Sequence, residues 1–287
     1  MKEITILSGK GGAGKTIVTA ALASVAPNAL FCDNDVDAAD LHLIFQPDVL
    51  ETHTFDSGKV ATINADLCTN CGLCEDSCRF TAIHKNKNNS PEVNPFQCEG
   101  CRLCERICPA NAITTTQNLN NEWFISSTRF GTLVHAKMGP GEENSGKLVT
   151  KIRERAKEIA SEIRADFIIN DGPPGIGCTA ISSITGTDAV LLVIEPTVSG
   201  LHDAKRVIKL INSFEVPVFA AINKFDINPA FTTTVEDFLR ENKIPLVGKI
   251  PFTELMVESM IEQKTVVEYA PENTISKTFF EIWAAIS

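Results

Sequence analysis

The segment GKGGAGKT, residues 9–16, has residue types and spacing that suit phosphate binding. A loop this rich in glycine lets backbone N–H groups converge on phosphate oxygens without clashes between Cβ atoms. The Lys15 ammonium can reach the β- and γ-phosphates of a nucleotide, and the Thr16 hydroxyl can hold Mg²⁺. We therefore expect ATP or ADP with Mg²⁺ here, a chance match being the alternative. The expected contacts are Gly9, Lys10, Gly11, Gly12, Ala13, Gly14, Lys15 and Thr16.

Eight of the ten cysteines form two quartets with the spacing C-x₂-C-x₂-C-x₃-C. The second quartet repeats the first after 30 residues, and Ala82-Ile83 recurs as Ala112-Ile113 at the same offset. Three closely spaced thiolates and a fourth from elsewhere suit the corners of a four-iron, four-sulfur cluster. Structural zinc on the C-x₂-C pairs is the alternative. The quartets are Cys68, Cys71, Cys74 and Cys78, then Cys98, Cys101, Cys104 and Cys108.

The duplicated segment, residues 60–116, resembles the bacterial two-cluster ferredoxins. In that family the fourth cysteine of each quartet ligates the other cluster. Pro109 follows the second quartet as in the family, whereas Arg79 replaces the usual proline after the first. The resemblance implies one [4Fe-4S] cluster on Cys68, Cys71, Cys74 and Cys108, and a second on Cys98, Cys101, Cys104 and Cys78.

Strands and helices must position the glycine-rich loop. The run Lys2–Ser8 predicts a buried strand before it, and residues 17–26 predict a helix after it. Further buried strands are predicted at 29–32 and 167–170, and at the runs that begin at Ala189, Val218 and Pro245, with helix-length segments between them. This alternation predicts an α/β fold with a doubly wound, mostly parallel sheet and helices on both faces.

The cysteine-rich segment lies between the early strands and the strand at 167–170. We therefore expect a P-loop domain made of residues 1–59 and 117–287. Residues 60–116 would form a small inserted α+β domain of the ferredoxin type.

Polar residues follow three of the predicted strands. Asp33 and Asp35 come after residues 29–32, Asp171 follows 167–170, and Asn223 ends the strand that begins at Val218. Open α/β sheets bind ligands at the carboxyl ends of their strands, so Asp171 is expected beside a ligand. Solvated turn residues are the alternative.

Lys10 gives the loop the form K-G-G-x-G-K-T, which resembles the deviant Walker A motif of the MinD/ParA ATPase family. The D-x-D pair at 33–35 and the D-x-P-P-G string at 171–175 extend the resemblance along the chain. It implies that Asp35 lies near the attacking water, that Asp171 holds Mg²⁺ and that Asn223 binds adenine. Catalytic roles are thus expected for Lys10, Lys15, Asp35 and Asp171, and Mg²⁺ contacts for Thr16, Asp35 and Asp171.

The same family resemblance implies a homodimer formed around ATP, in which Lys10 crosses the interface to the partner's nucleotide. A solvated loop lysine is the alternative. ATP hydrolysis is expected to be slow without a partner protein. The nitrogenase iron protein and the Mrp-type ATPases belong to the same family.

Three functions remain open at this point. The one we favour is an ATP-dependent electron-transfer switch acting with an unknown redox or cluster-acceptor protein. The second is an iron–sulfur scaffold or carrier of the Mrp type. Those ATPases hold a cluster on a C-terminal cysteine pair, and the lack of any cysteine after Cys178 counts against this function. The third is a MinD/ParA-like positioning ATPase, against which the last residues, 276–287, lack a basic polar face and are expected to form a core-docked helix.

Cys32 and Cys178 stand outside the quartets. Cys178 lies seven residues after Asp171, the spacing of a cluster ligand in the nitrogenase iron protein, so a bridging cluster is a hypothesis. A small buried apolar group is the alternative, and the one expected for Cys32.

The composition limits the partners and the compartment. The net charge of −10 argues against broad binding to nucleic acid or anionic lipid. We find no signal peptide and no apolar run near the roughly 20 residues of a membrane helix. Clustered cysteines without a secretory signal point to metal ligation in a reducing compartment, so a cytoplasmic protein without stable membrane association is expected.

Overall fold

The computed structural model describes residues 1–56, 58–139 and 145–287. The chain divides into two compact units. The first consists of Met1–His53, Trp123–Lys137 and Ser145–Ser287, and the second of Thr54–Glu122 and Met138–Asn144. The predicted insert at 60–116 falls inside the second unit, whose assignment as a ferredoxin-like domain stays a prediction.

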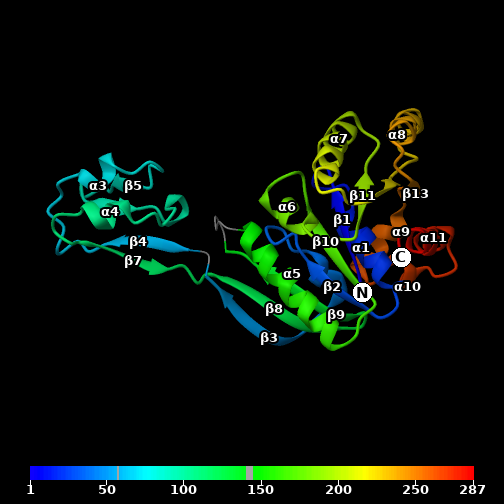
Figure 1. Ribbon diagram of the computed structural model, residues 1–287, viewed down its shortest axis with the longest axis horizontal. Coiled ribbons are helices and arrows are strands. Elements are labelled where there is room, and N and C mark those ends of the chain that lie inside the picture. The colour runs from blue at the N-terminus through cyan, green and yellow to red at the C-terminus, as the bar shows by residue number, and fades with distance from the viewer. Residues whose placement is uncertain (57, 140–144) are drawn as a thin grey trace. The chain divides into compact units, whose positions relative to one another are not determined.

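The first unit is built on a large sheet that runs in the order β13-β12-β11-β1-β10-β2-β9-β8-β3 (Figure 1). From β13 to β9, neighbouring strands pair in parallel. The strands are β1 Lys2–Ser8, β2 Ala29–Asp33, β3 Asp48–Phe55, β8 Asn121–Thr128, β9 Gly131–Lys137, β10 Phe167–Pro174, β11 Ala189–Ile194, β12 Val218–Asn223 and β13 Leu246–Ile250.

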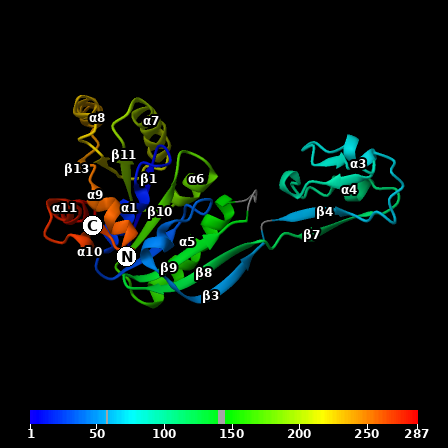
Figure 2. The ribbon, with the colours of Figure 1, turned by 180° about the vertical axis from the view of Figure 1, so that it is seen from behind.

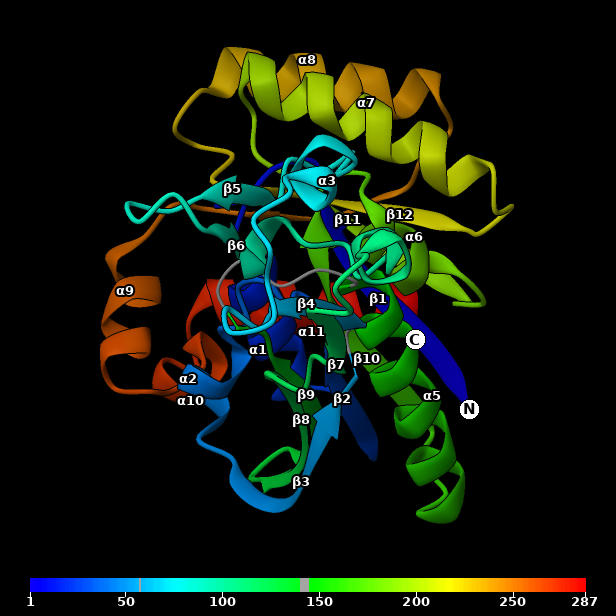
Figure 3. The same cartoon turned by 90° about the vertical axis from the view of Figure 1, so that its left-hand side faces the viewer.

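Helices cover both faces of this sheet because its central strands are apolar on both sides. Ile4 and Ile6 pack with α1, α2, α10 and α11, whereas Leu7 packs with α6, α7 and α8. Figure 2 shows α1, α9 and α11 gathered together, and Figures 1 and 3 show α7 beside α8. The predicted α/β fold with a mostly parallel sheet is therefore confirmed. The helices are α1 Lys15–Ala23, α2 Leu41–Phe45, α5 Ser145–Glu162, α6 Cys178–Ile184, α7 Val198–Asn212, α8 Pro229–Glu241, α9 Glu254–Ile261, α10 Val266–Tyr269 and α11 Thr274–Ile286.

The last helix, α11, belongs to the core of the first unit. Phe279, Ile282 and Ile286 are fully buried, and the Trp283 ring packs edge-on against Phe167 at 4.8 Å between centroids. The prediction of a core-docked final helix is confirmed. Among the described residues, no helix is long and apolar enough to cross a bilayer.

The second unit repeats its backbone after 30 residues. Its strands β4 Lys59–Ile63 and β7 Ile113–Gln117 pair antiparallel, as do β5 Ile83–Lys85 and β6 Pro91–Val93. The short helices α3 Leu73–Asp76 and α4 Leu103–Ile107 occupy equivalent places. Left-handed residues recur at the same offset, at Asn70 and Gly100, Gly72 and Arg102, and Thr81 and Asn111. The sequence duplication is thus a duplication of local structure.

The core of the second unit contains little apolar material. Its central cluster in the described chain is made of Ala61, Cys74, Ile83 and Ile113, and Ala82 and Ala112 are buried as well. Ile63, Val93 and four further cysteines pack against this cluster, the cysteines being Cys78, Cys98, Cys104 and Cys108. A unit of fewer than about 80 residues rarely folds on so small a core without a disulfide or a metal. All ten cysteines are free thiols in this structure.

Candidate nucleotide site and cysteine cavities

The phosphate loop connects the carboxyl end of β1 to the first turn of α1. Gly14 lies just before the helix with φ of 93°, and a Cβ on it would come within 2.2 Å of Asn223 Nδ2, so only glycine fits. A cavity of about 520 Å³ opens beside the loop. It is lined by Gly11, Gly12, Gly14, Lys15, Thr16, Ile17, Asp35, Asp37, Ala38, Asp40, Leu43, Ile44, Pro173, Pro174, Thr179 and Met260. The structure therefore brings the predicted loop together with Asp35.

Lys15 is almost fully buried, with an exposed fraction of 5%. Its Nζ lies 3.6 Å from Asp35 Oδ2. A buried ammonium needs anionic partners, and phosphate oxygens in this cavity would supply them. The position of Lys15 fits its predicted contact with a nucleotide.

Asp171 lies in the middle of β10, opposite the first turns of α1. Its Oδ1 accepts a hydrogen bond of 2.8 Å from the Thr19 hydroxyl. Burial raises the pKa of Asp171, against the lowering effect of Lys15 and of the hydroxyls of Thr16 and Thr19. Its Oδ2 is buried and has no hydrogen-bond partner among the residues described. A buried carboxylate oxygen left free beside Thr16 fits the predicted Mg²⁺ site.

Asp33 and Asp35 differ in what surrounds them. The Asp33 carboxylate is fully buried and accepts backbone N–H groups from Asp35 at 3.2 Å and Leu41 at 3.3 Å. Asp33 thus holds the turn after β2. Asp35 lines the cavity, and burial raises its pKa to about 6, against the lowering effect of Lys15. A carboxyl with a pKa near neutrality suits proton exchange with water.

Lys10 is held within its own chain. Its Nζ lies 2.9 Å from Glu195 Oε2, while Lys224 Nζ lies 3.3 Å from Glu195 Oε1. The side chain of Lys10 is 31% exposed, so it can leave this contact. Burial favours the protonated form of Glu195, but both lysines lower its pKa below the ordinary value. Glu195 therefore bridges two cations beside the phosphate loop.

Asn223 occupies the predicted place at the end of β12 but does not line the cavity. Its Nδ2 donates a 2.8 Å hydrogen bond to the carbonyl of Ala13, and its Oδ1 accepts one from the Lys224 backbone. In this structure the amide braces the phosphate loop. Its predicted contact with adenine stays a prediction.

The cysteines of the second unit line two separate cavities. One, of about 250 Å³, is lined by Cys74, Cys78, Cys98, Cys101 and Cys104. The other, of about 20 Å³, is lined by Cys68, Cys71, Cys74 and Cys108. The lining of each cavity thus combines the fourth cysteine of one quartet with the first three of the other, and Cys74 lines both cavities. The ligand sets that the ferredoxin resemblance implies stay a prediction.

Backbone amides also point at these sulfurs. Ala61 N–H donates to Cys98 Sγ at 3.5 Å, and Ala112 N–H donates to Cys108 Sγ at 3.3 Å. Such N–H···S contacts stabilise thiolates and tune the potential of a bound cluster.

In the described part of the chain, no three or more His, Cys, Asp or Glu side chains are placed to hold a metal ion. A single zinc ion would need sulfurs about 4 Å apart around one point. A cuboidal cluster spaces its four thiolates more widely, around a body that fills the space between them. The larger cavity, at about 250 Å³, has room for a body of that kind, whereas the smaller one, at about 20 Å³, has room for little more than a water molecule. The clusters therefore stay a prediction.

The lone cysteines lie apart from these cavities. Cys32 is fully buried in β2, where burial raises its pKa well above the ordinary value and its Sγ contacts Asn34 Oδ1 at 3.1 Å. This is the core position that was expected. Cys178 is exposed at the start of α6, and its role in a bridging cluster stays a hypothesis.

Sequence reasoning missed Thr19, Glu195 and Lys224. Thr19 lies four residues after Lys15 on α1, so helical spacing places both on the face toward β10. Glu195 follows β11 directly, and Asn223 similarly stands at the end of β12. The strand-end rule that selected the other polar residues could have found it.

Comparison with known proteins places this site in a family. A model of the CobQ/CobB/MinD/ParA nucleotide-binding domain matches residues 4–266. An uncharacterised protein of Methanocaldococcus jannaschii is 36% identical over 229 residues, covering 79% of each chain.

Solved structures extend this likeness to the fold. The septum site-determining protein MinD of Pyrococcus horikoshii, solved with Mg-ADP, superposes with a TM-score of 0.61 at 19% identity, over 100% of this chain and 96% of that one. MinD of Aquifex aeolicus, solved with MinC, gives 0.60 at 20% identity over 99% and 95%. At these identities the likeness establishes the fold alone.

Proposed function

The chain belongs to the CobQ/CobB/MinD/ParA family of nucleotide-binding proteins, and from this we propose that it is an ATPase that switches by dimerising around ATP. The observation that carries this proposal is the cavity beside the phosphate loop, where Lys15, Asp35 and Thr16 meet. Lys15 would hold the β- and γ-phosphates and Thr16 would hold Mg²⁺. Asp171 would orient Mg²⁺ through water.

Hydrolysis needs an oriented water at the γ-phosphate. Asp35 lines the cavity next to Lys15, and its carboxylate can accept a proton from that water. Pro173 and Pro174, which belong to the D-x-P-P-G string, line the same cavity. The following loop, residues 175–177, contains two glycines, which would allow it to move when the γ-phosphate leaves.

Lys10 would act between two copies of the chain. In the free chain it is paired with Glu195, and in the dimer it would exchange this carboxylate for the phosphates of the partner's nucleotide. The resemblance to MinD and ParA supports this dimer, and no contact with another chain is needed to build the rest of the site.

We also propose that the second unit carries two [4Fe-4S] clusters and that the protein is an ATP-dependent electron-transfer switch. The two cavities lined by the crossed cysteine quartets support this assignment, as does the small apolar core between them. When bound, such clusters accept and release single electrons. The cysteines would hold them, and the N–H groups of Ala61 and Ala112, which donate to Cys98 Sγ and Cys108 Sγ, would tune the sulfurs.

Iron and sulfide analysis of anaerobically purified protein tests the cluster assignment. We expect about eight irons and eight sulfides per chain, since each cluster holds four of each. Cys108→Ser should lose the cluster assigned to Cys68, Cys71, Cys74 and Cys108, whereas Cys178→Ser should keep the wild-type iron content. Wild-type protein without iron, after anaerobic reconstitution, would remove the electron-transfer proposal and leave the ATPase.

The fold likeness favours a second candidate, a positioning ATPase of the MinD/ParA kind. The superposition with Pyrococcus horikoshii MinD spans the whole chain. The buried apolar face of α11 argues against a C-terminal membrane helix. Sedimentation with anionic vesicles and ATP decides between the two: ATP-dependent binding would favour positioning, and its absence together with iron would favour electron transfer.

A further inference from the structure

The two cysteine cavities differ in charge. The cavity of Cys78, Cys98, Cys101 and Cys104 is also lined by Arg79, Arg102 and Arg106, with Glu99 as its single carboxylate. The cavity of Cys68, Cys71, Cys74 and Cys108 has no charged side chain in its lining. The internal repeat therefore produced two sites with the same ligands and different surroundings.

The repeat shows that the arginines are not required by the backbone. At an offset of 30 residues, Arg102 corresponds to Gly72, Arg106 to Asp76 and Arg79 to Pro109. Gly72 and Arg102 both have left-handed backbone, with φ of 78° and 63°. Arginine adopts this conformation at an energetic cost that glycine avoids. Arg102 is thus strained at a position where the other half of the repeat has an unstrained glycine, Gly72. Backbone strain of this kind is typical of functional positions, which points to a function of the Arg102 guanidinium.

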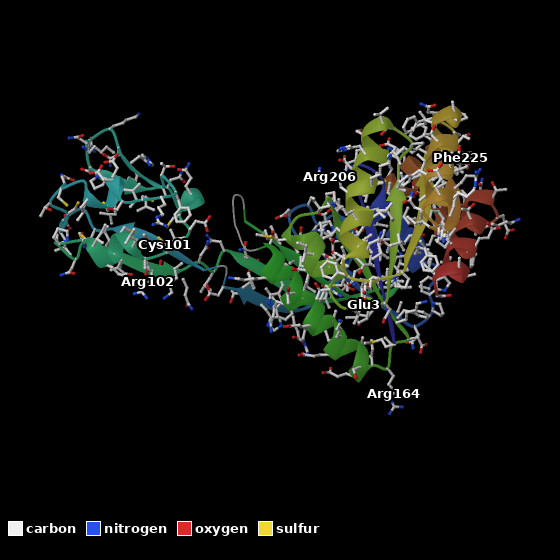
Figure 4. The ribbon with its side chains drawn as sticks, turned by 45° about the horizontal axis from the view of Figure 1, so that its top comes forward. Glu3, Cys101, Arg102, Arg164, Arg206 and Phe225 are labelled. Carbon is white, nitrogen blue, oxygen red and sulfur yellow. The ribbon has the colours of Figure 1, made fainter. Side chains whose placement is uncertain are left out.

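The surroundings of this cavity have the composition of a docking site. All three arginines are exposed, as are the apolar side chains of Phe80 at 42% and Leu103 at 40%. Figure 4 labels Arg102 beside Cys101 where the chain enters α4. Arg102 is held in place by Glu105, whose Oε2 lies 2.7 Å from Nε. Protein interfaces combine exposed apolar and arginine side chains in this way.

We propose that this basic rim, defined as Arg79, Arg102 and Arg106, docks an acidic electron-carrier protein against the cluster held by Cys78, Cys98, Cys101 and Cys104. The inference rests on the proposed iron–sulfur function. Because the whole chain carries a net charge of −10, it repels an acidic protein in most orientations of approach. An orientation that brings the acidic protein to the basic rim is attractive instead. In the transfer step the carrier loses one electron and this cluster gains it, while no bond or proton moves.

Binding of an acidic flavodoxin, a one-electron carrier, tests the rim. The variant Arg79→Glu/Arg106→Glu reverses two charges, and Lys85→Glu/Lys87→Glu is its matched control, since both lysines are exposed in the same unit and line neither cavity. At low ionic strength we expect the rim variant to bind about tenfold more weakly by titration calorimetry, with the control unchanged. The difference should shrink with salt over the range where the Debye length falls to about 10 Å.

Iron content separates the possible outcomes. If wild-type and variant proteins carry equal iron but bind flavodoxin equally, docking at the rim is overturned and the cluster assignment stands. If no protein carries iron, both proposals fall. Arg102→Gly, which copies the other half of the repeat, provides a second variant without charge reversal: it should keep its iron and bind about threefold more weakly.

Discussion

Asp35 is the residue whose chemistry the structure defines most closely. Its pKa of about 6 lies above the ordinary value because the carboxyl is buried, and Lys15 offsets only part of this effect. The folded chain therefore binds the proton more tightly than the unfolded chain does. The contribution of Asp35 to the free energy of unfolding therefore decreases as the pH rises from about 4 to 6. Above pH 6, Asp35 is mostly a carboxylate that can accept a proton.

We predict that ATP hydrolysis rises with pH through about 6 and then levels, because only the ionised Asp35 can act as a base. Asp35→Asn should lower the rate at least about 100-fold. Asp37→Asn is the matched control, since Asp37 lines the same cavity but is exposed. Phosphate release assays from pH 5 to 8 measure both, and full activity of Asp35→Asn would exclude the role.

Glu195 is predicted to restrain dimerisation, because it holds Lys10 within its own chain at 2.9 Å. Glu195→Gln should strengthen the ATP-bound dimer about fivefold, the equivalent of roughly 1 kcal/mol for a partly exposed ion pair. Analytical ultracentrifugation with a non-hydrolysable ATP analogue measures this. The control is Glu236→Gln, which breaks the ion pair between Glu236 on α8 and Lys249 on β13. This variant should dimerise as strongly as the wild type. Weaker dimerisation of Glu195→Gln would show that Glu195 supports the dimer instead.

Sequence motifs predicted the loop residues and Asp171 because their spacing is local. They could not predict the ion pair of Lys10 with Glu195, since 185 residues separate the two and only the sheet order brings them together. The same applies to Asn223, whose contact with Ala13 depends on β12 lying two strands from β1.

At the scale of elements, the sequence predicted the strands well where both faces are apolar. The run Lys2–Ser8 forms β1 as predicted, and β11 and β12 begin at Ala189 and Val218 as expected. β10 continues four residues beyond the predicted 167–170, because its pairing with β1 continues past the apolar run. Strand β3 was not foreseen, since its residues are mostly exposed and lack a buried face.

Helices α5 and α6 are joined by one buried side chain. Arg153 of α5 donates to Glu3 Oε1 on β1 and to the carbonyls of Ser182 and Thr185 at the end of α6 (Figure 4 labels Glu3). Arg153 therefore holds α5 to the end of α6 within the first unit.

We predict that Arg153→Met destabilises the protein by about 3 to 5 kcal/mol, because it leaves the buried carboxylate of Glu3 without its closest cation. Arg155→Met is the control on the same helix. Arg155 pairs with exposed Glu158, so its loss should cost less than about 1 kcal/mol. Urea unfolding of the nucleotide-free protein compares the two, and equal midpoints would contradict the role of Arg153.

At the scale of the whole molecule, the chain joins a nucleotide site and two cysteine-lined cavities. The 30-residue repeat was legible in the sequence because cysteine spacing and Ala-Ile pairs recur together. The difference in charge between the two cavities could not be predicted from the sequence. It depends on which side chains the folded repeat places around each quartet. Family comparison shows a nucleotide-binding domain of the CobQ/CobB/MinD/ParA family, and the proposal that distinguishes this chain within the family rests on the cysteines.

The central claim is that nucleotide binding and the clusters are coupled. Reduction potentials of the anaerobically purified protein, measured without nucleotide, with ADP and with a non-hydrolysable ATP analogue, test it most directly. Our account predicts a shift of about 60 mV or more between the ADP and ATP-analogue states, which for one electron is a tenfold coupling. Identical potentials in all three states, in protein that carries both clusters and binds the nucleotide, would contradict it.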